Sequence, residues 1–314
     1  PLPAPRISIE GMQERLRSQG ERFALLDEIE GWSLSEGLRL TVRFDTAEDP
    51  YLNDHRIENT AVVPGVMAVE CFAEALRLVE GGGGPISIED LSFEAPLKLY
   101  RKACLHVQAV AGPAGREYRM RMETRRELKG GREQRTLHYR ARVRLEPTDL
   151  KHEAQRLPRH LMGNVAIDKG TIYRAYFHGP GFHVLEQAGD DGQAGLLGEL
   201  NAARLQPQLG RPAQLQSWPM LTELAFQTAG LLEARKDKRL GLPARVKRLR
   251  IHPSQPDARH PIQAHVLCEQ GTSEYSARVQ DDQGRVFIEV EGYQTSALPW
   301  PLPEEVQAGL NPKA

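Results

Sequence analysis

A histidine that lies shortly before an apolar helical segment has the residue type and the position for proton transfer. His55 stands next to Asp54, in a segment that leads to Pro64 and Gly65. Imidazole titrates near neutral pH, so a neutral His55 could act as a general base. The unpaired amides of Gly65 or Val66 at the helix start could hold a developing oxyanion. The alternative is a structural or solvated histidine, the more common role in a loop.

A glutamate inside a second apolar segment could supply the complementary acid. Glu223 is the one ionisable side chain between Trp218 and Leu232, and Gln227 follows it four residues later. Residues four apart share a face of a helix, so Gln227 could orient the carboxylate. Burial would raise the pKa of the Glu223 carboxyl group and keep it protonated near neutral pH. If this helix is instead partly exposed, Glu223 points to solvent.

A turn built from glycine and proline, within residues 176–186, carries a histidine on either side. These residue types force a tight, irregular turn, and Phe182 is expected to anchor it by packing. The segment lacks the spacing and the lysine of a phosphate-binding loop, so we predict that it forms a wall of a pocket. The residues assigned to that pocket are Pro64, His178, Gly179, Pro180 and Phe182.

The first half of the chain alternates apolar and polar residues, which predicts strands around one helix. Residues 37–45 read GLRLTVRFD, in which every second side chain is apolar. Further strands are expected at 86–100, 103–111, 117–126 and 135–146. Between them, apolar residues recur at helical spacing from Val66 to Val79, and the Gly81–Gly84 run ends that helix.

The second half repeats this order. A segment at 165–187 leads to strands near 194–205, and then to the apolar helix that begins at Trp218-Pro219. Strands are expected near 244–252, 261–270, 273–280 and 285–296. We therefore predict an α+β protein in which two antiparallel sheets each wrap a long central helix. The predicted parts are an N-terminal linker at 1–20, a first half at 21–146, a linker at 147–163, a second half at 164–298 and a C-terminal linker at 299–314.

Both ends are rich in proline and polar residues, as linkers between domains tend to be. A domain cut from a longer polypeptide and a free protein with frayed ends both fit. The composition, 40% hydrophobic and 26% charged with a net charge of -1, disfavours a nucleic-acid-binding protein. We find no apolar run long enough to cross a membrane and no signal peptide, and we expect a cytoplasmic location. The cysteines, Cys71, Cys104 and Cys268, form neither a disulfide framework nor a zinc motif.

Two motifs of the first and middle segments resemble the dehydratase domains of modular polyketide and polyunsaturated fatty acid synthases. The family motif His-x-x-x-Gly-x-x-x-x-Pro is matched from His55 to Pro64, with Asn59 in place of the glycine. Asparagine tolerates a positive φ better than most residues. The turn FHGPGF at 177–182 resembles the Gly-Pro turn of the family, in the variant found in iterative synthases.

The third motif resembles the family's Pro-x-Leu-Leu-Asp segment, whose Asp is followed four residues later by Gln or His. Residues 219–227, PMLTELAFQ, align with it without a gap, and Glu223 replaces the aspartate. The extra methylene moves the carboxyl group by about 1 Å, and misplacement on that scale can lower a rate about a hundredfold. The resemblance covers roughly residues 20–298 and implies a double hotdog fold.

The resemblance also implies a reaction and its partners. The domain would be a 3-hydroxyacyl-[acyl-carrier-protein] dehydratase (a lyase), using His55 as base, the amide of Gly65 or Val66 for the thioester oxygen, and Glu223 as acid. The substrate would arrive on the phosphopantetheine arm of an acyl carrier protein, beside neighbouring synthase domains and in a possible homodimer. No metal or organic cofactor is expected. The alternatives are a product-template or cyclase-type domain of the same fold and a non-catalytic acyl-binding scaffold.

Two basic clusters could receive an acidic carrier protein. One is formed by Arg119, Arg121, Arg140, Arg142 and Arg144, which are expected on one outward face of adjacent strands. The other is formed by Arg245, Lys247, Arg248 and Arg250. For either cluster the alternative is a solvated sheet face without a partner.

Overall fold

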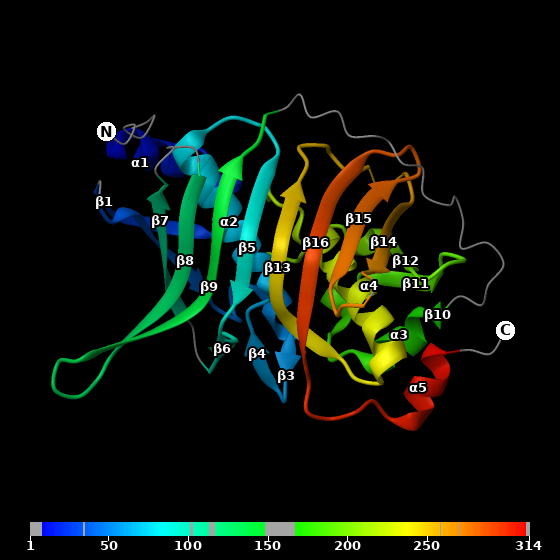
Figure 1. The fold of residues 1–314 in the computed structure, drawn as a ribbon. Coiled ribbons are helices and arrows are strands. Elements are labelled where there is room, and N and C mark those ends of the chain that lie inside the picture. Colours follow the sequence, from blue (N-terminus) through cyan, green and yellow to red (C-terminus); the bar gives the residue numbers. More distant parts are fainter. Residues whose placement is uncertain are drawn as a thin grey trace. The chain divides into compact units, whose positions relative to one another are not determined.

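The computed structural model describes residues 8–33, 35–100, 103–112, 117–147, 167–257, 259–269 and 271–311. The chain divides into two compact units. The first is formed within Pro1–Thr148 and Gln208–Ser217, and the second within Asp149–Pro207 and Trp218–Ala314. Each unit combines an antiparallel sheet with one long helix, which agrees with the predicted α+β class (Figure 1).

The first unit begins with short helices and continues into its sheet. Its helical elements are α1 (Ile9–Ser18), η1 (Gly20–Phe23), η2 (Pro50–Asp54) and α2 (Gly65–Glu80). Its strands are β1 (Leu26–Ser33), β2 (Gly37–Phe44), β3 (Arg56–Ile57), β4 (Thr60–Val62), β5 (Ile86–Phe93), β6 (Lys98–Leu99), β7 (Ala103–Ala111), β8 (Glu117–Glu127) and β9 (Glu133–Leu145). The main sheet follows the order β1-β2-β7-β8-β9-β5 with antiparallel neighbours. β3, β4 and β6 form a small second sheet.

The alternation in the first half produces the predicted packing. Leu38, Leu40, Val42 and Phe44 of β2 are all buried, whereas Arg43 is exposed. α2 packs against β8 and β9 and is buried from Val66 to Val79, as expected of a helix that is apolar on nearly every side. Gly81, with φ of +67°, ends it as the glycine run predicts.

The second unit has the same plan of strands around one helix. Its helical elements are α3 (Lys169–Ala175), η3 (Pro180–Phe182), η4 (Ala202–Arg204), α4 (Pro219–Asp237) and α5 (Glu304–Leu310). Its strands are β10 (Ile167–Asp168), β11 (Leu185–Asp190), β12 (Leu196–Leu200), β13 (Gly241–Ile251), β14 (Ile262–Cys268), β15 (Tyr275–Asp281) and β16 (Val286–Ala297). Their order in the sheet is β13-β16-β15-β14-β12-β11-β10. α4 packs against β12, β14 and β15 (Figure 1).

Two segments that the sequence predicts as linkers contain docked helices. α1, within the predicted linker 1–20, is capped by Ser8 and buries Met12 completely. α5, within 299–314, buries Val306 and Leu310 and packs on α3 and α4. Both helices are short and expose most of their polar side chains, so their apolar periodicity is weak. Most of the predicted linker 147–163 lies outside the described residues.

Residues Gln208–Ser217 return to the first unit, which the sequence does not indicate. Arg211 donates to the Ala24 carbonyl at 2.8 Å and pairs with the buried Asp49 at 3.2 Å. Glu70 of α2, which is fully buried, accepts hydrogen bonds from the Gln216 amide at 2.6 Å and the Ser217 amide at 2.8 Å. This segment leads directly into α4, so Glu70 fixes the backbone just before the first residue of that helix.

A second buried carboxyl group, that of Glu74, lies one turn along α2. Glu74 accepts hydrogen bonds from the amides of Leu25 at 3.1 Å and Leu26 at 3.3 Å. Burial, and the nearby Glu70 carboxylate, raise the pKa of Glu74 well above its ordinary value, so its protonated form donates to Glu70. The pair therefore carries a proton that an unfolded chain would release near neutral pH.

Replacement of Glu74 by glutamine is expected to stabilise the protein increasingly as pH rises. The pKa of Glu74 is higher in the folded protein than in the unfolded chain. Glu74 therefore stabilises the fold fully at a pH below its unfolded-state pKa, and this stabilisation is lost as pH rises through its folded-state pKa. The loss amounts to about 1.4 kcal/mol for each pH unit, and an amide that imitates the protonated acid avoids it. Urea unfolding at several pH values measures the effect. Glu70→Gln is the matched control. Glu70 accepts three hydrogen bonds from residues 216–217, so this variant should lose about 1–3 kcal/mol of its free energy of unfolding. A Glu74→Gln difference that does not change with pH would contradict the shared proton.

Candidate active site

His55 is buried and its imidazole is fixed by the backbone of β4. The residue follows η2 and is 9% exposed, which excludes the solvated alternative. Its Nδ1 lies 2.7 Å from the Val62 carbonyl oxygen, and the Val62 amide donates to the His55 carbonyl at 2.9 Å. A carbonyl can only accept, so Nδ1 carries the proton of the neutral ring and Nε2 holds the lone pair. Burial lowers the pKa of His55 to about 4, so the ring is neutral at neutral pH.

The hairpin that folds Val62 back onto His55 explains Asn59. β3 and β4 pair through Ile57 and Thr60, which leaves a two-residue turn of Glu58 and Asn59. Both turn residues have positive φ, 49° and 64°, as a type I′ hairpin turn requires. Asparagine adopts this backbone region at low cost, so the turn that positions the histidine survives the replacement of the family glycine.

The start of α2 lies close to the same hairpin in the chain. Pro64 is buried at the N-cap, and the Met67 amide donates to its carbonyl at 3.0 Å. The amides of Gly65 and Val66 belong to the first turn, where an α-helix offers no acceptor of its own. A side chain at Gly65 would overlap the ring of Phe93, so this position accepts only glycine. The start of α2 therefore offers backbone amide donors next to the Phe93 ring.

Glu223 lies inside the second unit and not on an exposed face. It is 6% exposed, and Gln227 donates from Nε2 to its Oε1 at 2.8 Å, as the spacing of four predicts. Burial raises the pKa of Glu223 to about 7, and the Gln227 hydrogen bond opposes that rise. The carboxyl group is thus largely protonated up to neutral pH, the state that a proton donor needs.

The Gly-Pro-Gly turn forms η3 and brings His178 to the acid. The side chains of His178 and Glu223 are 6% and 8% exposed, and His178 Nε2 lies 3.4 Å from Glu223 Oε1. Phe182 is fully buried, as predicted, and its carbonyl accepts from Gln227 Nε2 at 3.0 Å. Gly179 serves as the N-cap of η3, whereas Pro180 is exposed.

The sequence prediction omitted two tyrosines of this region, Tyr173 and Tyr176. The Tyr173 hydroxyl lies 2.9 Å from Gln227 Oε1 and accepts from the Leu185 amide at 2.8 Å. The Tyr176 hydroxyl donates to the main-chain carbonyl of Gln227. Tyrosines three residues apart share a face of a helix, and Asp168 marks a helix start just before them. The sequence signal for these two tyrosines is therefore their spacing of three residues after a helix start.

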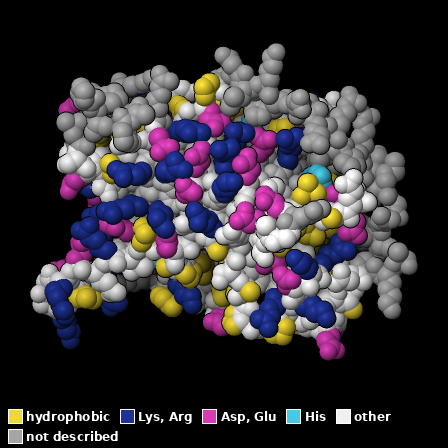
Figure 2. Space-filling view, in the orientation of Figure 1, with side chains coloured by type: hydrophobic (Ala, Val, Ile, Leu, Met, Phe, Trp, Pro, Cys, Tyr) yellow, Lys and Arg dark blue, Asp and Glu magenta, His cyan; other side chains and the backbone are white. Residues whose placement is uncertain are grey.

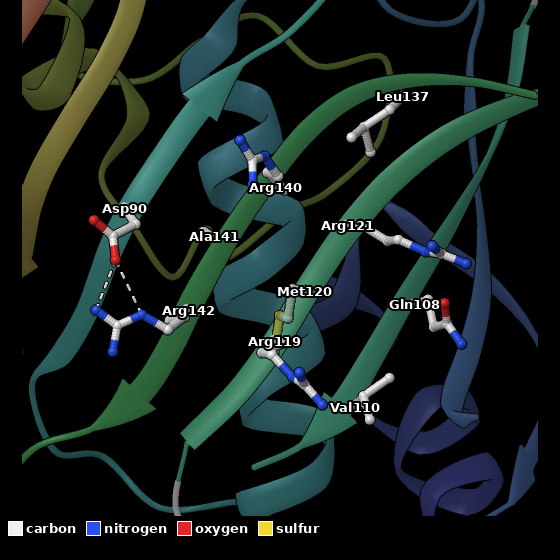
Figure 3. A pocket seen from close by; sticks show the side chains of 10 residues that line it. All are labelled: Asp90, Gln108, Val110, Arg119, Met120, Arg121, Leu137, Arg140, Ala141 and Arg142. Atoms are coloured by element: carbon white, nitrogen blue, oxygen red, sulfur yellow. Dashed lines mark hydrogen bonds and ion pairs between the residues drawn. The ribbon is translucent and has the colours of Figure 1, made fainter. Parts of the chain in front are cut away.

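The first basic cluster lies on the outward face of the first unit's sheet, but most of its charges are compensated. Arg142 contacts Asp90 at 2.7 Å and Glu117 at 3.2 Å, Arg140 contacts Glu94 at 2.6 Å, and Arg144 contacts Glu89 at 2.9 Å. Figure 2 shows basic and acidic side chains interspersed on this face. A groove of about 520 Å³ crosses it (Figure 3), with Asp90 bonded to Arg142 at one side. Such a balanced face gives an acidic partner little long-range attraction.

The second cluster also contains ion pairs. Arg248 contacts Glu291 at 3.4 Å, and Arg250 contacts Glu289 at 3.2 Å, while Arg245 and Lys247 are exposed on β13. Within the described residues no group of three or more His, Cys, Asp and Glu side chains is arranged to hold a metal ion. None of the helices in the described ranges is long and apolar enough to span a membrane.

The two units share their architecture with a structurally known class of dehydratases. The dehydratase domain from the CurF module of curacin polyketide synthase aligns with a TM-score of 0.72 at 18% identity. The alignment covers 88% of this chain and 100% of that domain. The fold is thus the double hotdog, as the sequence resemblance implied.

Sequence comparison identifies the family. The profile described as polyketide synthase dehydratase domain matches residues 25–125. The profile described as polyketide synthase dehydratase N-terminal domain matches residues 145–304, about half of the chain. The chain belongs to the polyketide synthase dehydratase domain family.

The curated relatives are much longer than this chain. The mycocerosic acid synthase-like polyketide synthase of Mycobacterium tuberculosis is 27% identical over 266 residues, which are 79% of this chain and 12% of that protein. Polyketide synthase GfsA of Streptomyces halstedii is 37% identical over 79 residues, which are 25% of this chain and 1% of that protein. The chain therefore spans only a small part of the length of either relative.

Proposed function

We propose that this domain removes water from a 3-hydroxyacyl thioester that an acyl carrier protein presents on its phosphopantetheine arm in the cytoplasm. His55 is the base and Glu223 is the acid. The observation that carries the proposal is the complementary state of the two groups. Burial keeps His55 neutral above about pH 4 and keeps Glu223 protonated up to about pH 7.

The proposed reaction balances with these two side chains alone. His55 Nε2 takes the proton from the carbon next to the thioester, and the electron pair released forms the carbon–carbon double bond. The amide of Gly65 or Val66 holds the thioester oxygen while negative charge develops on it. The bond from the β-carbon to its hydroxyl breaks, and Glu223 protonates the departing oxygen to give water. The proposal assigns no step to a metal or an organic cofactor.

A direct assay tests the reaction. The purified domain is mixed with a 3-hydroxyacyl thioester on a carrier protein, and mass spectrometry follows the loss of one water from the acyl chain. Formation of the enoyl thioester is the expected result. Ring formation in place of the enoyl product would favour the cyclase-type alternative. Binding without any chemical change, in a folded protein and with several chain lengths, would favour the acyl-binding scaffold.

The dependence of kcat/KM on pH is expected to be bell-shaped. Activity should rise as pH increases through about 4, because His55 must lose its proton to act as a base. Activity should fall as pH increases through about 7, because Glu223 must keep its proton to act as an acid. Initial rates with the carrier-bound substrate measure both limbs. A falling limb that is still absent at about pH 9 would exclude Glu223 as the acid.

A further inference from the structure

Three hydrogen bonds in sequence connect the backbone of β11 to the Glu223 carboxyl group. The Leu185 amide donates to the Tyr173 hydroxyl oxygen at 2.8 Å, and that hydroxyl lies 2.9 Å from Gln227 Oε1. Gln227 Nε2 then donates to Glu223 Oε1 at 2.8 Å. These groups come from three separate elements, β11, α3 and α4. The chain ends on the side chain to which the proposed reaction assigns proton donation.

The direction of every bond in this chain is fixed at its first link. A backbone amide can only donate, so it occupies an acceptor position of the Tyr173 oxygen and leaves the hydroxyl proton to be donated. The nearest acceptor is Gln227 Oε1, since the Phe182 carbonyl is 3.5 Å away. The Gln227 carboxamide therefore turns its NH₂ group toward Glu223 and toward the Phe182 carbonyl, 3.0 Å away.

We propose that Tyr173 is a positioning residue for the acid, because its hydroxyl holds the Gln227 amide with the NH₂ group directed at Glu223. This inference rests on the proposed role of Glu223. An NH₂ donor stabilises the carboxylate, so its loss raises the pKa of Glu223. Tyr173 thereby influences the pH above which Glu223 is ionised and can no longer donate a proton. It also holds the Glu223 carboxyl group in one position.

The surroundings of Glu223 contain other groups that influence it. His178 lies 3.4 Å away in the turn after α3, and Tyr173 and Tyr176 face it from the same part of the chain. Tyr293 faces it from β16, and burial, together with the Glu223 carboxylate, raises the pKa of that phenol well above its ordinary value. The Tyr173 hydroxyl bonds to the side-chain amide that touches the acid. Tyr176 bonds to the main chain of Gln227 and offers a matched control.

The test compares Tyr173→Phe with Tyr176→Phe, since each change removes one buried hydroxyl group. For Tyr173→Phe we expect kcat to fall roughly tenfold with little change in KM, and the falling limb of the pH profile to move to higher pH. For Tyr176→Phe we expect a lower unfolding temperature with an unmoved falling limb. In a Gln227→Leu background, Tyr173→Phe should add no further shift, because the chain is already broken.

Infrared difference spectra of wild type against Glu223→Gln report the ionisation of this carboxyl group without any turnover. An ionisation that moves to higher pH in Tyr173→Phe supports the inference even if Glu223 proves dispensable for catalysis. If activity depends on Glu223 but neither the spectrum nor the falling limb moves in Tyr173→Phe, the inference is overturned. Should Tyr173→Phe fail to fold, Gln227→Leu breaks the same chain one link later. An unmoved ionisation in that variant overturns the inference equally.

Discussion

The His55→Ala variant is expected to lose about a hundred- to ten-thousandfold in dehydration rate, the usual contribution of a positioned general base. The physical reason is the fixed tautomer. The Val62 carbonyl, 2.7 Å from Nδ1, leaves the lone pair of the neutral ring on Nε2, and no other atom of this residue can take the substrate proton. Steady-state rates with the carrier-bound substrate measure the loss.

Two further variants separate chemistry from folding in this prediction. His55→Asn retains a side-chain NH₂ that can donate toward the Val62 carbonyl but has no basic nitrogen, so it should fold as wild type and remain inactive. His106→Ala removes a histidine of β7 that pairs with Glu30 at 2.8 Å, and it should retain the wild-type rate. Retained activity in a folded His55→Ala protein would remove His55 from the mechanism.

The sequence predicts the parts of the fold that periodicity controls. α2 and α4 are long and apolar, and β2 and β9 alternate, so burial alone decides their structure. The observed helix spans Pro219–Asp237, beginning where the Trp-Pro pair predicts. α1 and α5 bury only one or two residues each, and no periodic signal distinguishes such helices from a linker.

In the candidate site, the sequence predicts the contacts within one helix but not those between distant segments of the chain. Glu223 and Gln227 could be paired from the sequence because a helix fixes the distance between residues four apart. Tyr173 reaches Gln227 across 54 positions, and Glu70 reaches Ser217 across 147. Contacts of that separation depend on how the chain turns between elements, which local composition does not encode. The directed hydrogen-bond chain to the acid therefore became visible only in three dimensions.

The Glu223→Gln variant is expected to lose dehydration to a similar extent, about a hundred- to ten-thousandfold, while keeping an earlier step. Glutamine has no proton to give to the leaving hydroxyl, but His55 remains able to take the proton next to the thioester. In heavy water this variant should exchange that hydrogen for deuterium without forming the enoyl product. Mass spectrometry of the carrier-bound acyl chain detects the exchange. His55→Ala should show neither exchange nor product, and exchange in that variant would assign the base elsewhere.

The Glu223→Asp variant tests whether the hydrogen-bond partners of Glu223 are placed for the longer side chain. Aspartate is the residue of the resembled motif, yet here it would withdraw the carboxyl group by about 1 Å from its partners. Gln227 Nε2 at 2.8 Å and His178 Nε2 at 3.4 Å both contact Oε1 of the glutamate, and the Tyr173 chain holds the amide in place. Because these partners sit on packed elements that cannot follow the shorter residue, we expect a rate about a hundredfold below that of wild type. A rate equal to or above wild type would mean that the site tolerates either length, and that its hydrogen bonds do not set the position of the acid.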